Sequence, residues 1–162
     1  MGSRSYYIDP YNKNKTEKSQ ALNIARAIAK ETRRVTRQEK LFPKRARWQG
    51  CYTLMDCALK LHMAVAYANG IRVETHALMV ERFNAQTMAI SWTYTMGAVI
   101  SSMQDDLEAD ADKLEPLAGL INNAHAVLTA WKTADLKRFE QQFGSLRAEE
   151  LGEPGVLRLR WF

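Results

Sequence analysis

The stretch CYTLMDCALKLHMAVAYANG, residues 51–70, decides the fold. Its apolar residues recur at alternating spacings of three and four, which is the pattern of a helix with one buried seam. The seam consists of Cys51, Leu54, Ala58, Leu61, Val65 and Ala68. We therefore predict a helix from about Lys44 to Asn69. The pair Asn69-Gly70 predicts a left-handed stop at its C-terminal end.

The same spacing recurs in the last third of the chain and predicts a second seamed helix. Its seam consists of Leu114, Leu117, Ile121, Ala124, Leu128 and Trp131. Asp112 and Glu115 have the spacing of a capping box, and Pro116 would then lie in the tolerated first turn. We expect this helix to end near Thr133.

Two further helices complete the pattern. The first begins after Thr16 and runs to about Glu39, because Pro43 disfavours a helical conformation at Phe42. Its apolar positions are Leu22, Ala25, Ile28 and Val35. The other runs over about residues 73–104 and is apolar on more than one face. Such a helix is expected to be central in the fold, or to face a second subunit as well.

Four amphipathic helices with short connections predict an all-α, up-down-up-down four-helix bundle over residues 16–134. Residues 1–15 lack helical periodicity and are expected to form an extended N-terminal arm. Residues 135–162 are expected to form a C-terminal extension, with a further short helix over about residues 135–150.

Composition limits the function classes. The 162-residue chain has a formal net charge of +5, which is compatible with nucleic acid, an anionic membrane or an acidic protein as partner. No apolar run reaches the roughly 18 residues of a membrane span, and the N-terminus has no apolar signal core, so we expect no membrane association. Cys51 and Cys57 should point to different faces of one helix, which predicts free thiols and a cytoplasmic location.

Catalytic and metal-binding patterns are weak. His62, His76 and His125 fall on three different predicted helices, with no acidic residue at ligand spacing beside them. The Glu-x-x-His pair of di-metal bundles is missing, as are phosphate-binding loops and nucleophile motifs. The acidic run over residues 105–112 lacks the glycine and terminal glutamate of a calcium loop and is expected to be a solvated turn. We predict no enzyme activity, no metal and no cofactor.

The segment from Arg26 to Arg47 carries nine basic residues against Glu31 and Glu39. Four of the basic residues are spaced four, three and four apart, so they lie along one line of a helix, and most have no acid one turn away. Arginine outnumbers lysine, which favours bidentate contacts with phosphate. The alternative is an ordinary solvated helix face. The candidate nucleic-acid-binding residues are Arg26, Lys30, Arg33, Arg34, Arg37, Lys40, Lys44, Arg45 and Arg47.

Aromatic residues are expected to contribute in two ways. The tryptophans inside predicted helices should lie in the core or at an interface rather than serve as platforms for bases: Trp48, Trp92 and Trp131. The better candidates for exposed contacts lie near the two ends of the chain: Tyr6, Tyr7, Trp161 and Phe162.

Two stretches together carry a family resemblance. The turn from Phe42-Pro43-Lys44 to Arg47-Trp48 opens a helix that ends in Ala68-Asn69, and LEPLAGLINNAHAVLTAWKTAD follows at residues 114–135. In order and spacing they resemble the accessory variability determinants of diversity-generating retroelements. The resemblance covers roughly residues 33–137. The related four-helix proteins encoded in ribosomal RNA intervening sequences share the expected fold.

The resemblance implies a non-enzymatic protein that assembles into a barrel-shaped homopentamer of four-helix protomers. Such proteins bind the reverse transcriptase of their element and its RNA, with DNA as a further possible partner, and support mutagenic cDNA synthesis. Two other functions remain open. The basic stripe could dock the acidic segment 105–115 of a neighbour in a protein-only interaction module, or the chain could be a ribosome-associated bundle protein. A metal-dependent bundle enzyme is the hypothesis that the residues favour least.

Overall fold

The computed structural model describes residues 17–38, 42–107 and 109–144, and it confirms the four-helix bundle. The elements in chain order are α1 Glu17–Thr36, α2 Lys44–Ala46, the π-helix η2 Arg47–Cys51, α3 Tyr52–Gly70, α4 His76–Asp105 and α5 Ala111–Phe143. Because α2, η2 and α3 follow one another without a gap, they form one long helix. The predicted arm, the cap Thr16 and the aromatic residues of both chain ends lie outside the described residues.

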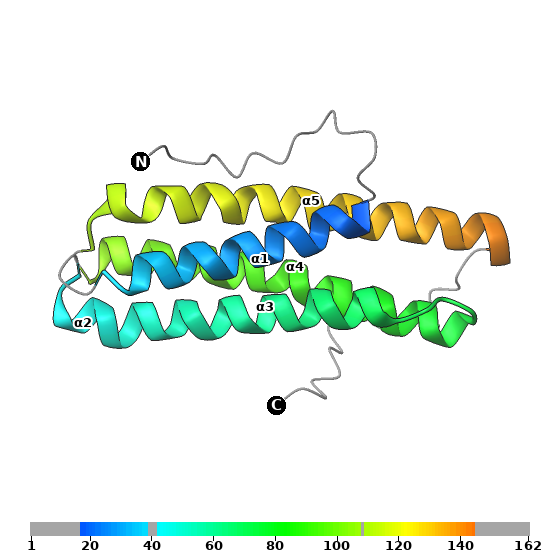
Figure 1. The fold of residues 1–162 in the computed structure, drawn as a ribbon, viewed down its shortest axis with the longest axis horizontal. Coiled ribbons are helices and arrows are strands. Elements are labelled where there is room, and N and C mark those ends of the chain that lie inside the picture. Colours follow the sequence, from blue (N-terminus) through cyan, green and yellow to red (C-terminus); the bar gives the residue numbers. More distant parts are fainter. Residues whose placement is uncertain (1–16, 39–41, 108, 145–162) are drawn as a thin grey trace.

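The four long helices lie side by side, and each runs antiparallel to the one before it (Figure 1). One end of the bundle holds the C-terminal end of α1, all of α2 and the connection from α4 to α5. We call it the α2 end. The opposite end holds the connection from α3 to α4 and the C-terminal end of α5 (Figure 1). No helix within the described part of the chain is both long enough and apolar enough to cross a membrane.

The core confirms both predicted seams. Every residue of the seam over 51–68 and of the seam over 114–131 is buried, and Trp131 has no exposed surface. In α1, Ala25, Ile28 and Val35 are buried as predicted, whereas Leu22 is half-buried. The 3,4 spacing therefore identified the faces that pack together in the bundle.

Several predicted helix ends were wrong. Gly70 stays helical, and the chain leaves α3 at Ile71, which is extended and donates its N–H to the carbonyl of Tyr67 at 3.3 Å. The predicted left-handed stop is therefore not formed. α4 begins at His76 rather than near residue 73, because Thr75 is its cap and accepts a hydrogen bond from the Leu78 N–H at 3.3 Å.

The start of α5 also differs from the prediction. Asp110, not Asp112, is the cap, and its carboxylate accepts a hydrogen bond from the Asp112 N–H at 3.0 Å. Pro116 is therefore the sixth residue of the helix and lies beyond its first turn. An acidic cap at this end is stabilised by the positive end of the helix dipole.

The largest difference is at the other end of α5. The helix does not stop near Thr133 but continues without a break to Phe143. Phe139 is buried against Met79 of α4, with Leu136 beside them. Because this second apolar cluster continues the packing of α4 on α5, residues 135–143 belong to the bundle helix and form no separate short helix.

Candidate nucleic-acid interface

A groove opens at the α2 end of the bundle, where α1 stops and the chain turns back into α2. It encloses about 410 Å³ and is lined by Arg33, Thr36, Arg37, Lys44, Arg47, Trp48, Cys51, Tyr52 and Met55. We call it the basic groove. Arg33 lies in the last turn of α1, and Arg37 directly follows that helix and donates its N–H to the carbonyl of Arg33 at 3.2 Å. Lys44 and Arg47 are nearly one turn apart on α2 and η2. All four side chains line the same groove.

Among the described residues that line the basic groove, four are cationic and none is acidic. Arg33 is exposed, and its Nε donates to the carbonyl of Ala29 at 3.1 Å, which holds the stem of this side chain along α1. Arg37 and Lys44 are exposed as well. Like charges that face one groove raise its potential and attract anions.

The other predicted residues are placed differently. Arg26 and Lys30 are exposed on α1 and extend the line of Arg33 and Arg37 away from the groove. Arg45 is exposed on α2 but does not line the groove. Lys40 lies outside the described residues. The structure therefore gathers four of the nine candidates around one groove.

Arg34 belongs to a local ion pair instead. Its Nη2 lies 2.6 Å from Oε1 of Glu31, and its Nε donates to Oε2 of the same carboxylate at 2.9 Å. The hydrogen bond to Glu31 raises the pKa of the Arg34 guanidinium, and burial lowers it by a smaller amount. Since the Glu31 side chain is largely buried, Arg34 neutralises that carboxylate and adds little to the field of the groove.

Two exposed aromatic side chains border the cations. Trp48 is 67% exposed and Tyr52 is 59% exposed, and their ring centroids lie 5.6 Å apart with planes tilted by 51°. Of the two places expected for Trp48, the core is excluded and an interface stays a prediction. A tryptophan and a tyrosine beside four cations form a surface that can meet both phosphates and aromatic rings.

The π-helix η2 changes which residues of the long helix face the core. The alternating spacing would continue the seam to Arg47, four residues before Cys51. The wider turn of η2 shifts the register by one residue, so that Ala46 is buried and Arg47 is only half-buried. Gly50 is buried in the same turn.

Gly50 fixes the position of this turn. A Cβ atom at residue 50 would collide with the side chain of Met103 on α4, which is fully buried. The backbone of η2 therefore packs directly on α4, an approach that only glycine permits.

Cys51 lines the basic groove and is a buried free thiol. Burial raises the pKa of its thiol, and the charge of Arg47 opposes that change to a smaller extent. Cys51 and Cys57 are both free and buried, which confirms that they are not joined in a disulfide. Burial therefore disfavours the thiolate, which is the form of cysteine that acts as a nucleophile.

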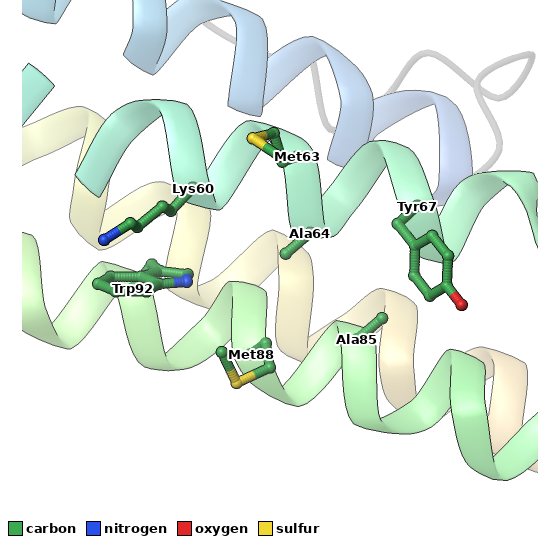
Figure 2. Close-up of a pocket in the computed structure, with 7 residues that line it drawn as sticks. All are labelled: Lys60, Met63, Ala64, Tyr67, Ala85, Met88 and Trp92. Atoms are coloured by element: carbon green, nitrogen blue, oxygen red, sulfur yellow. The ribbon is translucent and has the colours of Figure 1, made fainter. Parts of the chain in front are cut away.

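A second, apolar groove lies between α3 and α4 (Figure 2). Ala64 and Ala85 face each other across it, Met63 and Met88 lie along its two helices, and Trp92 lies at one end (Figure 2). The ammonium group of Lys60 is 5.2 Å from the centroid of the Trp92 ring. The small alanine side chains leave a hollow of about 60 Å³ between flexible methionines.

Beside this apolar groove, the long helix of η2 and α3 exposes large apolar side chains along one line. The residues are Trp48, Tyr52, Met55, Leu59 and Met63, and we call them the apolar stripe. The wide apolar surface predicted to face a second subunit belongs to α4, but that helix packs against both α3 and α5. Tyr94 is the one large apolar residue of the fully described helix α4 that is exposed.

The opposite end of the bundle holds a buried ion pair that the sequence did not reveal. Nη2 of Arg82 lies 2.6 Å from Oδ2 of Asp135, and the two side chains are 8% and 11% exposed. Nη1 of Arg82 donates to the carbonyl of Ile71 at 3.0 Å, and Nε2 of Gln86 donates to Asp135 at 2.7 Å. This network joins α4 to α5 and to the connection after α3.

The histidines make separate packing contacts. His125 lies 2.8 Å from the hydroxyl of Tyr94, and the ring of His76 packs edge-on against Phe139 at 5.1 Å. Across the described residues, no group of three or more histidine, cysteine or acidic side chains is placed to hold a metal ion.

Comparison with known proteins gives no match to a family model, to a curated protein or to a solved structure.

Proposed function

We propose that this chain is a non-enzymatic accessory protein of a diversity-generating retroelement. In this role it binds the template RNA through the basic groove, binds the reverse transcriptase and supports mutagenic cDNA synthesis. One observation supports the proposed binding of nucleic acid. Four cations line one groove, and none of the described residues of that lining is acidic: Arg33, Arg37, Lys44 and Arg47 are the cations. The resemblance over residues 33–137 supports the two other parts of the proposal, namely that the protein belongs to a diversity-generating retroelement and that its polymerase partner is the reverse transcriptase of that element.

Phosphate suits this groove for two physical reasons. Two of its four cations lie at the C-terminal end of α1 or directly after it, and two lie on α2 and η2, so a chain of phosphates between the two sides would relieve the repulsion on both. Three of the four are arginines, whose guanidinium groups bind phosphate oxygens in pairs. Binding would also release the counterions condensed on the nucleic acid, which adds to affinity and makes it salt-dependent.

The first test removes two charges from the groove. In the Arg33→Ala/Arg37→Ala variant, the slope of log affinity for RNA against log salt concentration should fall by about 1.4, because each lost phosphate contact on a single strand removes roughly 0.7. Fluorescence anisotropy of a labelled RNA over a salt series measures this slope. Both side chains are exposed, so the fold should be retained.

The matched control is Arg72→Ala/Lys137→Ala, which removes the same charge from exposed residues at the opposite end of the bundle. This variant should keep the slope of the original protein. Equal slopes for all three proteins would refute the groove as the RNA site. If RNA binding is unaffected while assembly is lost, the protein-only module becomes the better hypothesis.

The apolar stripe supports the assembly part of the proposal, in which the partner is a second copy of this chain. Leu59 and Met63 are 57% and 51% exposed, and Met63 lines the apolar groove of Figure 2. Asp56 and Lys60, an ion pair at 2.8 Å, lie on the same stretch of α3, so the two charges beside Leu59 and Met63 offset each other. The resemblance implies that the assembly is a pentamer.

The second test places charge on that surface. Leu59→Glu/Met63→Glu should dissociate the assembly toward the monomer mass, because buried unpaired carboxylates are costly at an interface. Light scattering after size-exclusion chromatography gives the mass. The control Thr129→Glu/Thr133→Glu adds the same charges at the same spacing to exposed positions of α5 and should leave the mass unchanged. A monomeric original protein would contradict the assembly proposal.

The proposal places the protein in the cytoplasm. The free state of Cys51 and Cys57 is compatible with a reducing compartment.

A further inference from the structure

We infer that the basic groove is specific for single-stranded nucleic acid, whose unpaired bases lie against Trp48 and Tyr52 while the backbone phosphates follow the cations. This inference rests on the proposed nucleic-acid function and names the class of strand that the groove takes. It also assigns binding roles to two aromatic residues that the basic stripe alone does not include.

The two aromatic side chains keep free ring faces in the groove. Trp48 and Tyr52 line the same groove as the four cations and are among the most exposed large apolar residues of the described chain. Their rings are tilted by 51° and do not stack face to face. Each ring therefore keeps a face that the other does not cover, and a planar base can pack on it.

Single strands and duplexes present different groups to such a surface. In a duplex the faces of the bases are covered by their stacked neighbours, so a protein surface meets only phosphates, sugars and base edges. An unpaired base exposes its face, and stacking on an aromatic side chain adds about 1–3 kcal/mol for each base. A duplex would therefore use the cations alone, whereas a single strand would use the cations and both rings.

The size of the groove suits individual nucleotides. The groove encloses about 410 Å³. Sites for small ligands enclose roughly 300–1,000 Å³, so this hollow is on the scale of single nucleotide units. Arg33 lies on α1, Arg37 directly after it, Lys44 on α2 and Arg47 on η2, whereas the rings lie on η2 and at the start of α3. Phosphates and bases of one strand therefore have separate places.

The charged residues nearby differ between the two ends of the apolar stripe, the end with Trp48 and Tyr52 and the end proposed for assembly. Trp48 and Tyr52 are bordered by the four cations of a groove without acidic residues among its described lining, whereas Leu59 and Met63 are bordered by the Asp56–Lys60 pair. Burying four cations against a neutral protein surface would cost desolvation energy without a compensating charge. Phosphate supplies that compensating charge.

The test compares an oligouridine with an RNA duplex of the same length at one low salt concentration. In the Trp48→Ala/Tyr52→Ala variant, affinity for the oligouridine should fall about tenfold or more, and affinity for the duplex should change less than about threefold. The variant Trp48→Phe/Tyr52→Phe keeps two aromatic rings and should retain most of the affinity for the single strand. Circular dichroism confirms that all variants are folded.

The outcomes distinguish this inference from the function on which it rests. If the alanine variant binds both RNAs like the original protein while Arg33→Ala/Arg37→Ala weakens both, the single-strand inference is wrong and the nucleic-acid function stands. If affinity for both RNAs falls equally in the aromatic variant, the inference is also wrong, because the rings then do not distinguish the two. If neither variant changes binding, the proposed site itself is refuted.

Discussion

Replacing Asp135 with alanine is expected to lower the free energy of unfolding by about 3–5 kcal/mol, because the buried guanidinium of Arg82 would lose its counterion. The carboxylate accepts hydrogen bonds from Arg82 at 2.7 Å and from Gln86 at 2.7 Å, and both donors would be left without it. Urea denaturation followed by circular dichroism measures the change in stability.

Arg138→Ala is the matched control for this prediction. Arg138 binds the other oxygen of the same carboxylate at 2.8 Å, but its side chain is mostly exposed. Losing an exposed ion pair should cost no more than about 1 kcal/mol. If Asp135→Ala and Arg138→Ala destabilise the protein equally, the buried pair does not hold this end of the bundle together.

Replacing Trp131 with alanine is the second change with a large expected effect. Trp131 has no exposed surface and belongs to the main core, and the guanidinium of Arg82 lies 5.3 Å from the centre of its ring. Removing the indole leaves a cavity and should lower the free energy of unfolding by about 3–5 kcal/mol. Thermal and urea denaturation both measure this loss.

Trp48→Ala provides the control with the same change of side chain. Because Trp48 is exposed, its removal should alter stability by no more than about 0.5 kcal/mol. Comparable losses for Trp48 and Trp131 would contradict the outward orientation of Trp48. They would also weaken its use as a probe of RNA binding.

The seams and the helix count could be predicted from sequence because they follow from local periodicity. Leu54 and Leu61 lie two turns apart in α3, and both are fully buried in the same core. The seam of α5 repeats this spacing. The end of α5 could not be predicted in the same way, because its continuation depends on Phe139 packing against Met79, a contact between residues far apart in the chain.

The candidate site, too, could be predicted only in part from the sequence. The excess of cations between Arg26 and Arg47 is visible in the sequence, but their convergence depends on how the end of α1 and α2 lie beside each other in the bundle. The burial of Ala46 in place of Arg47 depends on a π-helical turn, in which Gly50 packs against Met103. The buried ion pair between α4 and α5 joins residues 53 positions apart, and no local pattern indicates it.

The most direct test of the central claim, that the basic groove binds RNA, is photo-crosslinking to a single-stranded RNA that contains 4-thiouridine. Cleavage by trypsin after Arg47 and Lys60 releases residues 48–60 as one peptide, which contains both Trp48 and Tyr52. We expect mass spectrometry to find the crosslinked nucleotide on this peptide. Crosslinks confined to peptides of α5, with none on residues 48–60, would contradict the account.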